Sequence, residues 1–229
     1  MNGTEAKELV LKCLPQFPAV GLPSIQPSDI RKITSRAVCR LWAGMGSVYQ
    51  LTITLFSGTD IIFMCKRVRL PEVCESIGDL RKKHSYEVEV NFYKNGPAQQ
   101  LLNNGCVLPK PLFVEDQGDE GVTICMTRLT GQQGVMNMEQ TKAALKWLAK
   151  LHATYWGQNR ADSGVRQGLQ PQGGFWYLDT RPDEHQQMPS HGSVLTTPTT
   201  LLSLSLSLSC MHIRINTYIH TISIMFLMG

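Results

Sequence analysis

Residues 61–66 read Ile-Ile-Phe-Met-Cys-Lys, an apolar run that ends in a lysine. The pattern is typical of a half-buried strand, and we expect the strand to extend to Val68. Two interpretations fit the lysine. Most strand lysines lie on an edge strand in water, but a lysine on a buried strand can neutralise phosphate charge. Because Arg67 and Arg69 alternate faces with Lys66, only one register of this strand brings a cation to a ligand.

Two earlier strands and a glycine turn precede this run. Residues 37–43 and 47–56 have the composition of strands, and Gly44-Met45-Gly46 separates them. Glycines let a backbone come close to a phosphate and present its N–H groups. A turn with two glycines is more often a simple hairpin, so Gly44 and Gly46 indicate a phosphate site only together with other features.

A helix is predicted for residues 84–94, where aromatic and apolar side chains recur at helical spacing. The helix carries two glutamates, Glu87 and Glu89, which lie on different faces because they are two residues apart. In protein kinases a helical glutamate holds the phosphate-binding lysine. We therefore expect the glutamate that faces the sheet to pair with Lys66, and the other to be a solvated surface charge.

The remaining pattern completes an α+β fold. Strands are expected at 112–114 and 122–126, and helices at 4–14 and 137–156. The order is strand, glycine loop, strand, strand, helix, strand, strand, helix. This order predicts an antiparallel sheet packed with one helix, followed by a helical region.

The last predicted helix has an apolar stripe and a polar start. Asn137 and Gln140 resemble a capping box. The stripe comprises Met138, Leu145, Leu148, Leu151, His152 and Tyr155. We expect His152 and Trp156 to pack in a core rather than to act in catalysis, because both lie on this apolar helix.

The bulk composition excludes several classes of protein. The net charge of +4 comes from 22 basic and 18 acidic residues that are dispersed along the chain, which argues against a nucleic-acid partner. The seven cysteines are scattered singly, as expected for reduced, buried thiols in a cytoplasmic protein. Charged residues near the N-terminus (Glu5, Lys7, Glu8 and Lys12) argue against a signal peptide.

The C-terminal stretch differs from the rest of the chain. After Glu184 there is no Asp or Glu, and residues 202–209 alternate Leu and Ser. The alternation fits a strand with one apolar face, whereas Arg214 and Asn216 interrupt any membrane span, so no membrane partner is expected. A third interpretation is translated non-coding sequence, because a CT repeat encodes alternating Ser and Leu in every frame.

Five motifs in this order resemble the choline kinase-like group of the aminoglycoside phosphotransferase superfamily, which includes the ecdysteroid kinase-like branch. The last two are similar to that group's patterns LxWLAxfHAxfWG and GxYWxLxTRPDE. The resemblance covers roughly residues 30–188. The motifs are residues 41–46 (LWAGMG), 65–68 (CKRV), 85–93 (SYEVEVNFY), 144–157 (ALKWLAKLHATYWG) and 174–184 (GFWYLDTRPDE).

The resemblance implies a protein-kinase-like N-lobe over residues 30–130, after an N-terminal extension of residues 1–29. A partial helical C-lobe would follow over 131–188, and an irregular tail over 189–229. It also implies that ATP is the nucleotide and that the acceptor is a small alcohol of unknown identity.

The resemblance further assigns roles to single residues. It implies that Gly44 and Gly46 form the loop over the phosphates, that Lys66 is the phosphate-binding lysine, and that Glu89 is its helical partner. Residues 124–129 would form the hinge beside the adenine.

The chain departs from the family at the catalytic loop. The family reads HGDxxxxN there, and a later Asp holds Mg²⁺. Here His191-Gly192 is followed by Ser193, and Pro198 takes the place of the Asn. We therefore expect no catalytic residue and no metal ligand, with Mg²⁺ a cofactor of full-length relatives only. The sequence predicts a truncated, inactive kinase-like protein with weak ATP binding. The alternative is a non-catalytic nucleotide-binding or partner-binding module.

Overall fold

The computed structural model describes residues 1–41, 45–70, 77–130, 137–157, 167–169 and 186. The chain divides into two compact units, Met1–Thr130 and Gly131–Gly229. All the described strands lie in the first unit, and the described helix of the second unit is α5 (Met138–Thr154). The fold is of the α+β class, as predicted.

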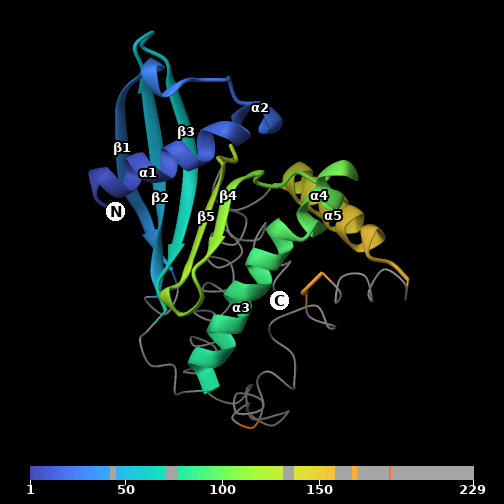
Figure 1. The fold of residues 1–229 in the computed structure, drawn as a ribbon. Coiled ribbons are helices and arrows are strands. Elements are labelled where there is room, and N and C mark those ends of the chain that lie inside the picture. Colours follow the sequence, from blue (N-terminus) through green and yellow to red (C-terminus); the bar gives the residue numbers. More distant parts are fainter. Residues whose placement is uncertain (42–44, 71–76, 131–136, 158–166, 170–185, 187–229) are drawn as a thin grey trace, which may run out of the picture. The chain divides into compact units, whose positions relative to one another are not determined.

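The first unit is built on a five-stranded antiparallel sheet (Figure 1). Its spatial order is β1-β2-β3-β5-β4, so β3 is the central strand. Lys66 on β3 lies opposite Val48 of β2 and Ile124 of β5. The interpretation of Lys66 as an edge-strand lysine is therefore wrong. The strands are Ile30–Arg40 (β1), Gly46–Leu55 (β2), Asp60–Val68 (β3), Pro111–Asp116 (β4) and Val122–Thr127 (β5).

The starts of two helices in this unit are set by the local sequence. Helix α1 begins with a capping box between Asn2 and Glu5, which satisfies two backbone N–H groups at its start. Pro97 at the first position of α4 has the φ angle that a helix start requires. The helices are α1 (Gly3–Cys13), α2 (Phe17–Val20), α3 (Ile77–Lys94) and α4 (Pro97–Asn103), with 3₁₀ turns at Leu14–Gln16, Pro27–Asp29 and Gly118–Glu120.

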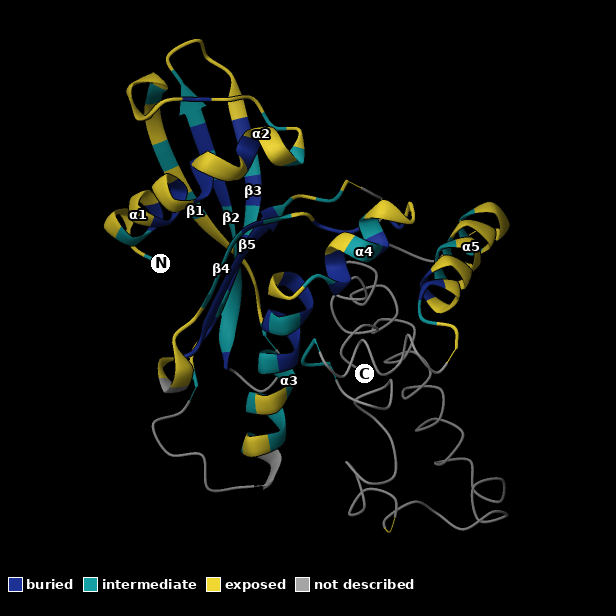
Figure 2. Cartoon of the chain, turned by 45° about the vertical axis from the view of Figure 1, so that its right-hand side comes forward, coloured by how far each residue is buried: buried dark blue, intermediate teal, exposed yellow. Residues whose placement is uncertain are grey.

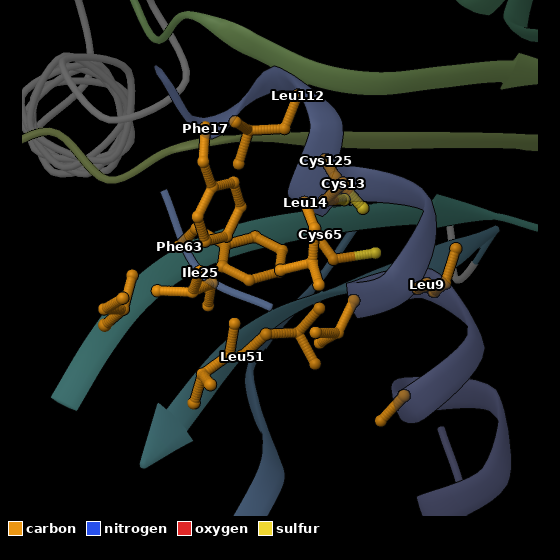
Figure 3. Close-up of a cluster of buried hydrophobic side chains, with 14 residues drawn as sticks. Leu9, Cys13, Leu14, Phe17, Ile25, Leu51, Phe63, Cys65, Leu112 and Cys125 are labelled. Atoms are coloured by element: carbon orange, nitrogen blue, oxygen red, sulfur yellow. The ribbon is translucent and has the colours of Figure 1, made fainter. Parts of the chain in front are cut away.

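Helix α1 and the residues that follow it share a hydrophobic core with one face of the sheet (Figure 3). The rings of Phe17 and Phe63 pack edge to face, with centroids 5.8 Å apart. Both side chains are fully buried, which stabilises the fold by about 1.5–3 kcal/mol each. Residues 1–29 therefore form part of the first unit. The buried cluster comprises Ala6, Leu9, Val10, Cys13, Leu14, Phe17, Ile25, Leu51, Ile53, Ile61, Phe63, Cys65, Leu112 and Cys125.

Strand β3 faces a different environment on each side. Phe63 and Cys65 point into the core that α1 covers. Because side chains alternate along a strand, Lys66 points to the opposite face, where it meets α3. Both faces of β3 are thus covered, and Lys66 is only 5% exposed.

The starts of two elements differ from the sequence prediction, and one helix was not predicted. Strand β1 begins at Ile30 rather than residue 37. The prediction missed residues 30–36 because most of them are polar and exposed and carry no run of apolar side chains. Helix α3 begins at Ile77 rather than residue 84, and its early Leu80 is 53% exposed, so no apolar stripe marks this start. Helix α4 was not predicted, since its seven residues are too few to show a period.

Helix α5 confirms the predicted capping box. The backbone N–H of Gln140 donates to Asn137 Oδ1, and that of Asn137 donates to Gln140 Oε1, both at 2.9 Å. The expected core packing of His152 and Trp156 is wrong: both are exposed, Trp156 by 79%. Most of α5 is exposed, as Figure 2 shows. His152 follows the buried Leu151 in the last turn of α5, and Trp156 lies beyond the end of the helix at Thr154. Residues 170–185, 187–229 and the motif at 174–184 lie outside the described residues.

Five cysteines fall within the described residues, and all five are free thiols. Cys13, Cys65, Cys106 and Cys125 are buried as expected, whereas Cys39 is exposed. The contact with Cys125, followed by burial, raises the pKa of the Cys65 thiol. This thiol is therefore protonated and unreactive in the folded protein.

Gly58 and Gly121 both have a positive φ angle, but they differ in the space available for a side chain. Gly121 has a φ of +122°, and a Cβ there would lie 2.1 Å from the carbonyl oxygen of Val68. Gly58 has a φ of +86°, and a Cβ there would have no neighbour within 4 Å. Gly58→Ala should cost about 1–2 kcal/mol through the backbone conformation alone. Gly121→Ala should cost about 1–3 kcal/mol more, because it also overpacks the sheet.

Urea denaturation of the two variants measures this difference as a shift in the unfolding midpoint. Equal shifts for Gly58→Ala and Gly121→Ala would contradict the close approach of β3 to Gly121.

Candidate functional site

Lys66 and Glu89 form a buried ion pair between β3 and α3. The Lys66 Nζ donates a hydrogen bond to Glu89 Oε2. The side chain of Lys66 is 7% exposed and that of Glu89 is not exposed at all. The predicted contact between this lysine and a glutamate of the helix is therefore present.

The second glutamate of α3 lies on the solvent side, as predicted. The side chain of Glu87 is 43% exposed, and its Oε2 lies 3.2 Å from Nδ1 of His84, one turn earlier. The neighbours of Glu89 in the sequence, Val88 and Val90, are buried at 3% and 2% exposure. The inner side of α3 is wide enough here to bury three consecutive residues, and Glu89 lies at its centre.

Tyr86 also belongs to the site, although the sequence analysis did not assign it there. The Lys66 Nζ lies 5.0 Å from the centroid of the Tyr86 ring, within the range of a cation–π contact. Burial, with a smaller effect from the Glu89 charge, raises the pKa of Tyr86 to about 12. The spacing of Tyr86 could have revealed this role, because Tyr86 and Glu89 are three residues apart and residues at that spacing lie on the same face of a helix.

The carboxyl group of Glu89 is in an unfavourable position for a charge. Burial raises its pKa, and the Lys66 ammonium partly offsets that effect. Within the described part of the chain, Oε1 of Glu89 and the hydroxyl of Tyr93 are buried without a hydrogen-bond partner. Burial also raises the pKa of Tyr93. A buried unsatisfied group costs about 1–3 kcal/mol, so this arrangement is not optimised for stability.

The glycine loop is only partly described. Gly44 lies outside the described residues, while Gly46 begins β2. Gly46 has a φ of +154°, and a Cβ there would lie 2.1 Å from the carbonyl oxygen of Arg67. Close packing of β2 on β3 is thus sufficient to require glycine at this position. A role for Gly44 and Gly46 in binding phosphate stays a prediction.

The predicted hinge begins on β5, beside Lys66. Ile124 is the β5 residue that lies opposite Lys66, and it is fully buried. The end of β5 is held by two hydrogen bonds at 2.9 Å: the Thr127 backbone N–H donates to the Lys110 carbonyl, and Lys110 N–H donates to Thr127 Oγ1. A role for residues 124–129 beside adenine is a prediction.

Comparison with known proteins identifies no family for this chain. No protein-family model matches the chain, and no curated protein matches it. Two searches of the described residues are also negative: no helix has the length and hydropathy to span a bilayer, and no three His, Cys, Asp or Glu side chains are grouped to hold a metal ion.

The ion pair predicts a pH dependence of stability. Lys66→Met leaves Glu89 buried without its counter-charge, which should raise the carboxyl pKa further above its ordinary value of 4.5. A raised carboxyl pKa means that the folded protein binds the proton more tightly than the unfolded chain. Its stabilising contribution is complete below pH 4.5 and is lost as the pH rises toward the folded pKa.

The free energy of unfolding of Lys66→Met should therefore fall more steeply than that of the wild type between pH 4.5 and 8. Urea denaturation across this range measures both slopes. Lys66→Met combined with Glu89→Gln is the control, and it should lack the added slope. Parallel profiles for Lys66→Met and wild type would show that Glu89 gains no proton.

Proposed function

We propose that the unit Met1–Thr130 binds a nucleotide in the manner of small-molecule kinases, with Lys66 neutralising phosphate charge. The observation that carries the proposal is the buried ion pair of Lys66 and Glu89 on the central strand. Lysine on a sheet strand, held by a helical glutamate, is the arrangement by which protein kinases contact the α- and β-phosphates of ATP.

The ion pair is better explained by ligand binding than by stability. Desolvation of two charges offsets most of their attraction, and an apolar pair of similar volume is often as stabilising. The Lys66 ammonium has three N–H donors, and Glu89 Oε2 takes one of them. The remaining N–H groups can donate hydrogen bonds to phosphate oxygens, while Glu89 and Tyr86 keep the ammonium in place.

The ligand we propose is ATP, bound weakly. ATP carries close to four negative charges, and Lys66 is the cation that the site offers to them. A charge-assisted hydrogen bond contributes about 1.5–3 kcal/mol. One such contact with burial of the adenine gives an affinity on the order of 0.1–1 mM.

We further propose that these 229 residues alone transfer no phosphoryl group. In the resemblance described above, Ser193 and Pro198 stand where the catalytic Asp and the metal-binding Asn are required. The chain would then act as a nucleotide-binding module of the aminoglycoside phosphotransferase kind. Its buried free thiols favour a reducing compartment such as the cytoplasm.

Nucleotide binding should depend on Lys66 and Glu89 but not on Glu87. Lys66→Met should abolish measurable ATP binding, because it removes the cation. Glu89→Gln should weaken binding by about tenfold, because the lysine loses its charged partner. Calorimetric titration with ATP measures each affinity, and circular dichroism checks that each variant is folded.

Glu87→Gln is the matched control, since it removes the same charge from the exposed side of the same helix. Unchanged ATP affinity in Lys66→Met would exclude this site. A larger effect of Glu87→Gln than of Glu89→Gln would show that the wrong face of α3 was chosen.

The absence of catalysis is tested separately. Purified chain with ATP, Mg²⁺ and a panel of amino alcohols, sugars and sterols should release ADP no faster than buffer. Turnover that disappears in Lys66→Met would mean that another residue replaces the missing base, and this part of the proposal would be wrong.

A further inference from the structure

A basic hollow lies on the opposite face of the sheet from Lys66. Its volume is about 250 Å³, and its lining includes Arg40, Arg67 and Arg69 together with the hydroxyl side chains Ser47 and Tyr49. Met1 and Gly46 complete the lining. None of the described residues that line the hollow is acidic.

Strand register brings the arginines together. Arg40 of β1 lies opposite Ser47 of β2, and Ser47 lies opposite Arg67 of β3. These three residues therefore form a row across adjacent strands, and Arg69 follows just after the end of β3. Arg67 is two residues after Cys65, so both side chains lie on the same face of β3. Arg67 therefore points to the α1 side, while Lys66 points to α3.

The hollow keeps an excess of positive charge. Glu5 of α1 has its Oε1 2.9 Å from Arg67 Nη1 and 3.8 Å from Arg69 Nη2. The pKa of Glu5 is lowered, first by the backbone N–H of Asn2 and then by Arg67, so this carboxylate is ionised. Among the described residues, Glu5 is therefore the carboxylate that pairs with Arg67 and Arg69, and Arg40 adds a third guanidinium group to the lining. The Nη1 of Arg67 is buried and, within the described residues, makes no hydrogen bond of good geometry.

We propose that this hollow binds the phosphate or pyrophosphate group of a small ligand, at a site separate from the proposed nucleotide site. The planar fork of arginine matches two phosphate oxygens at once, and Ser47 and Tyr49 add hydroxyl donors. Pockets for drug-sized ligands measure about 300–1,000 Å³. The smaller volume here suits a single anionic group rather than a whole nucleotide.

Titration of the full chain with inorganic pyrophosphate at low salt tests the site by calorimetry. Arg40 and Arg69 are exposed, so Arg40→Gln and Arg69→Gln leave the core intact. Each should weaken pyrophosphate binding about threefold to tenfold, and the double variant more than tenfold. Arg31→Gln is the matched control: it removes the same charge from an exposed position of β1, and it should change the affinity less than twofold.

Three results would overturn the site. The first is no measurable binding of pyrophosphate up to about 10 mM. The second is equal weakening of binding by Arg31→Gln and Arg69→Gln, and the third is loss of pyrophosphate binding in Lys66→Met. The two proposals fail separately. If ATP binding is lost in the arginine double variant but kept in Lys66→Met, the hollow is upheld as a phosphate site and the nucleotide site at Lys66 is wrong.

Discussion

The central position of β3 is the constraint on which the first unit depends. A strand covered on both faces cannot place a lysine in water, so Lys66 needs a carboxylate brought to it from outside the sheet. Glu89 supplies this charge, and its burial fixes which side of α3 faces β3. The register of the helix and the order of the strands are therefore linked through one contact. Any nucleotide chemistry of this unit would depend on that link.

The two faces of β3 carry different chemistry because neighbouring residues point in opposite directions. Lys66 is held at one place by Glu89 and Tyr86, and it is almost fully buried. Arg67 is next to it in sequence, but it points to the α1 side, where it pairs with Glu5 and lines the hollow with Arg40 and Arg69. One strand thus presents a buried, paired cation on one face and part of an arginine cluster on the other.

Local signals in the sequence were sufficient for the order of elements and the capping box at Asn137, because both follow from the spacing of a few neighbouring residues. Spacing showed only that Glu87 and Glu89 lie on different faces of their helix, and the choice of Glu89 came from the family resemblance. The central place of β3 and the docking of α1 on the sheet were not predictable, since both depend on contacts between distant segments. The exposure of Trp156 was missed for a related reason: whether an apolar residue is buried depends on packing partners that the sequence does not show.

The end of β3 lies between two glycines that have no room for a side chain. Gly46 packs against the carbonyl of Arg67, and Gly121 packs against the carbonyl of Val68. In evolutionary terms, both positions should resist substitution in any relative that keeps this sheet, whether or not that relative binds a ligand. An invariant glycine at position 46 would therefore be explained by the close packing of the backbone against β3 and would not by itself indicate a binding site. Retention of Lys66 and Glu89 together would be the evidence that selection acts on the site.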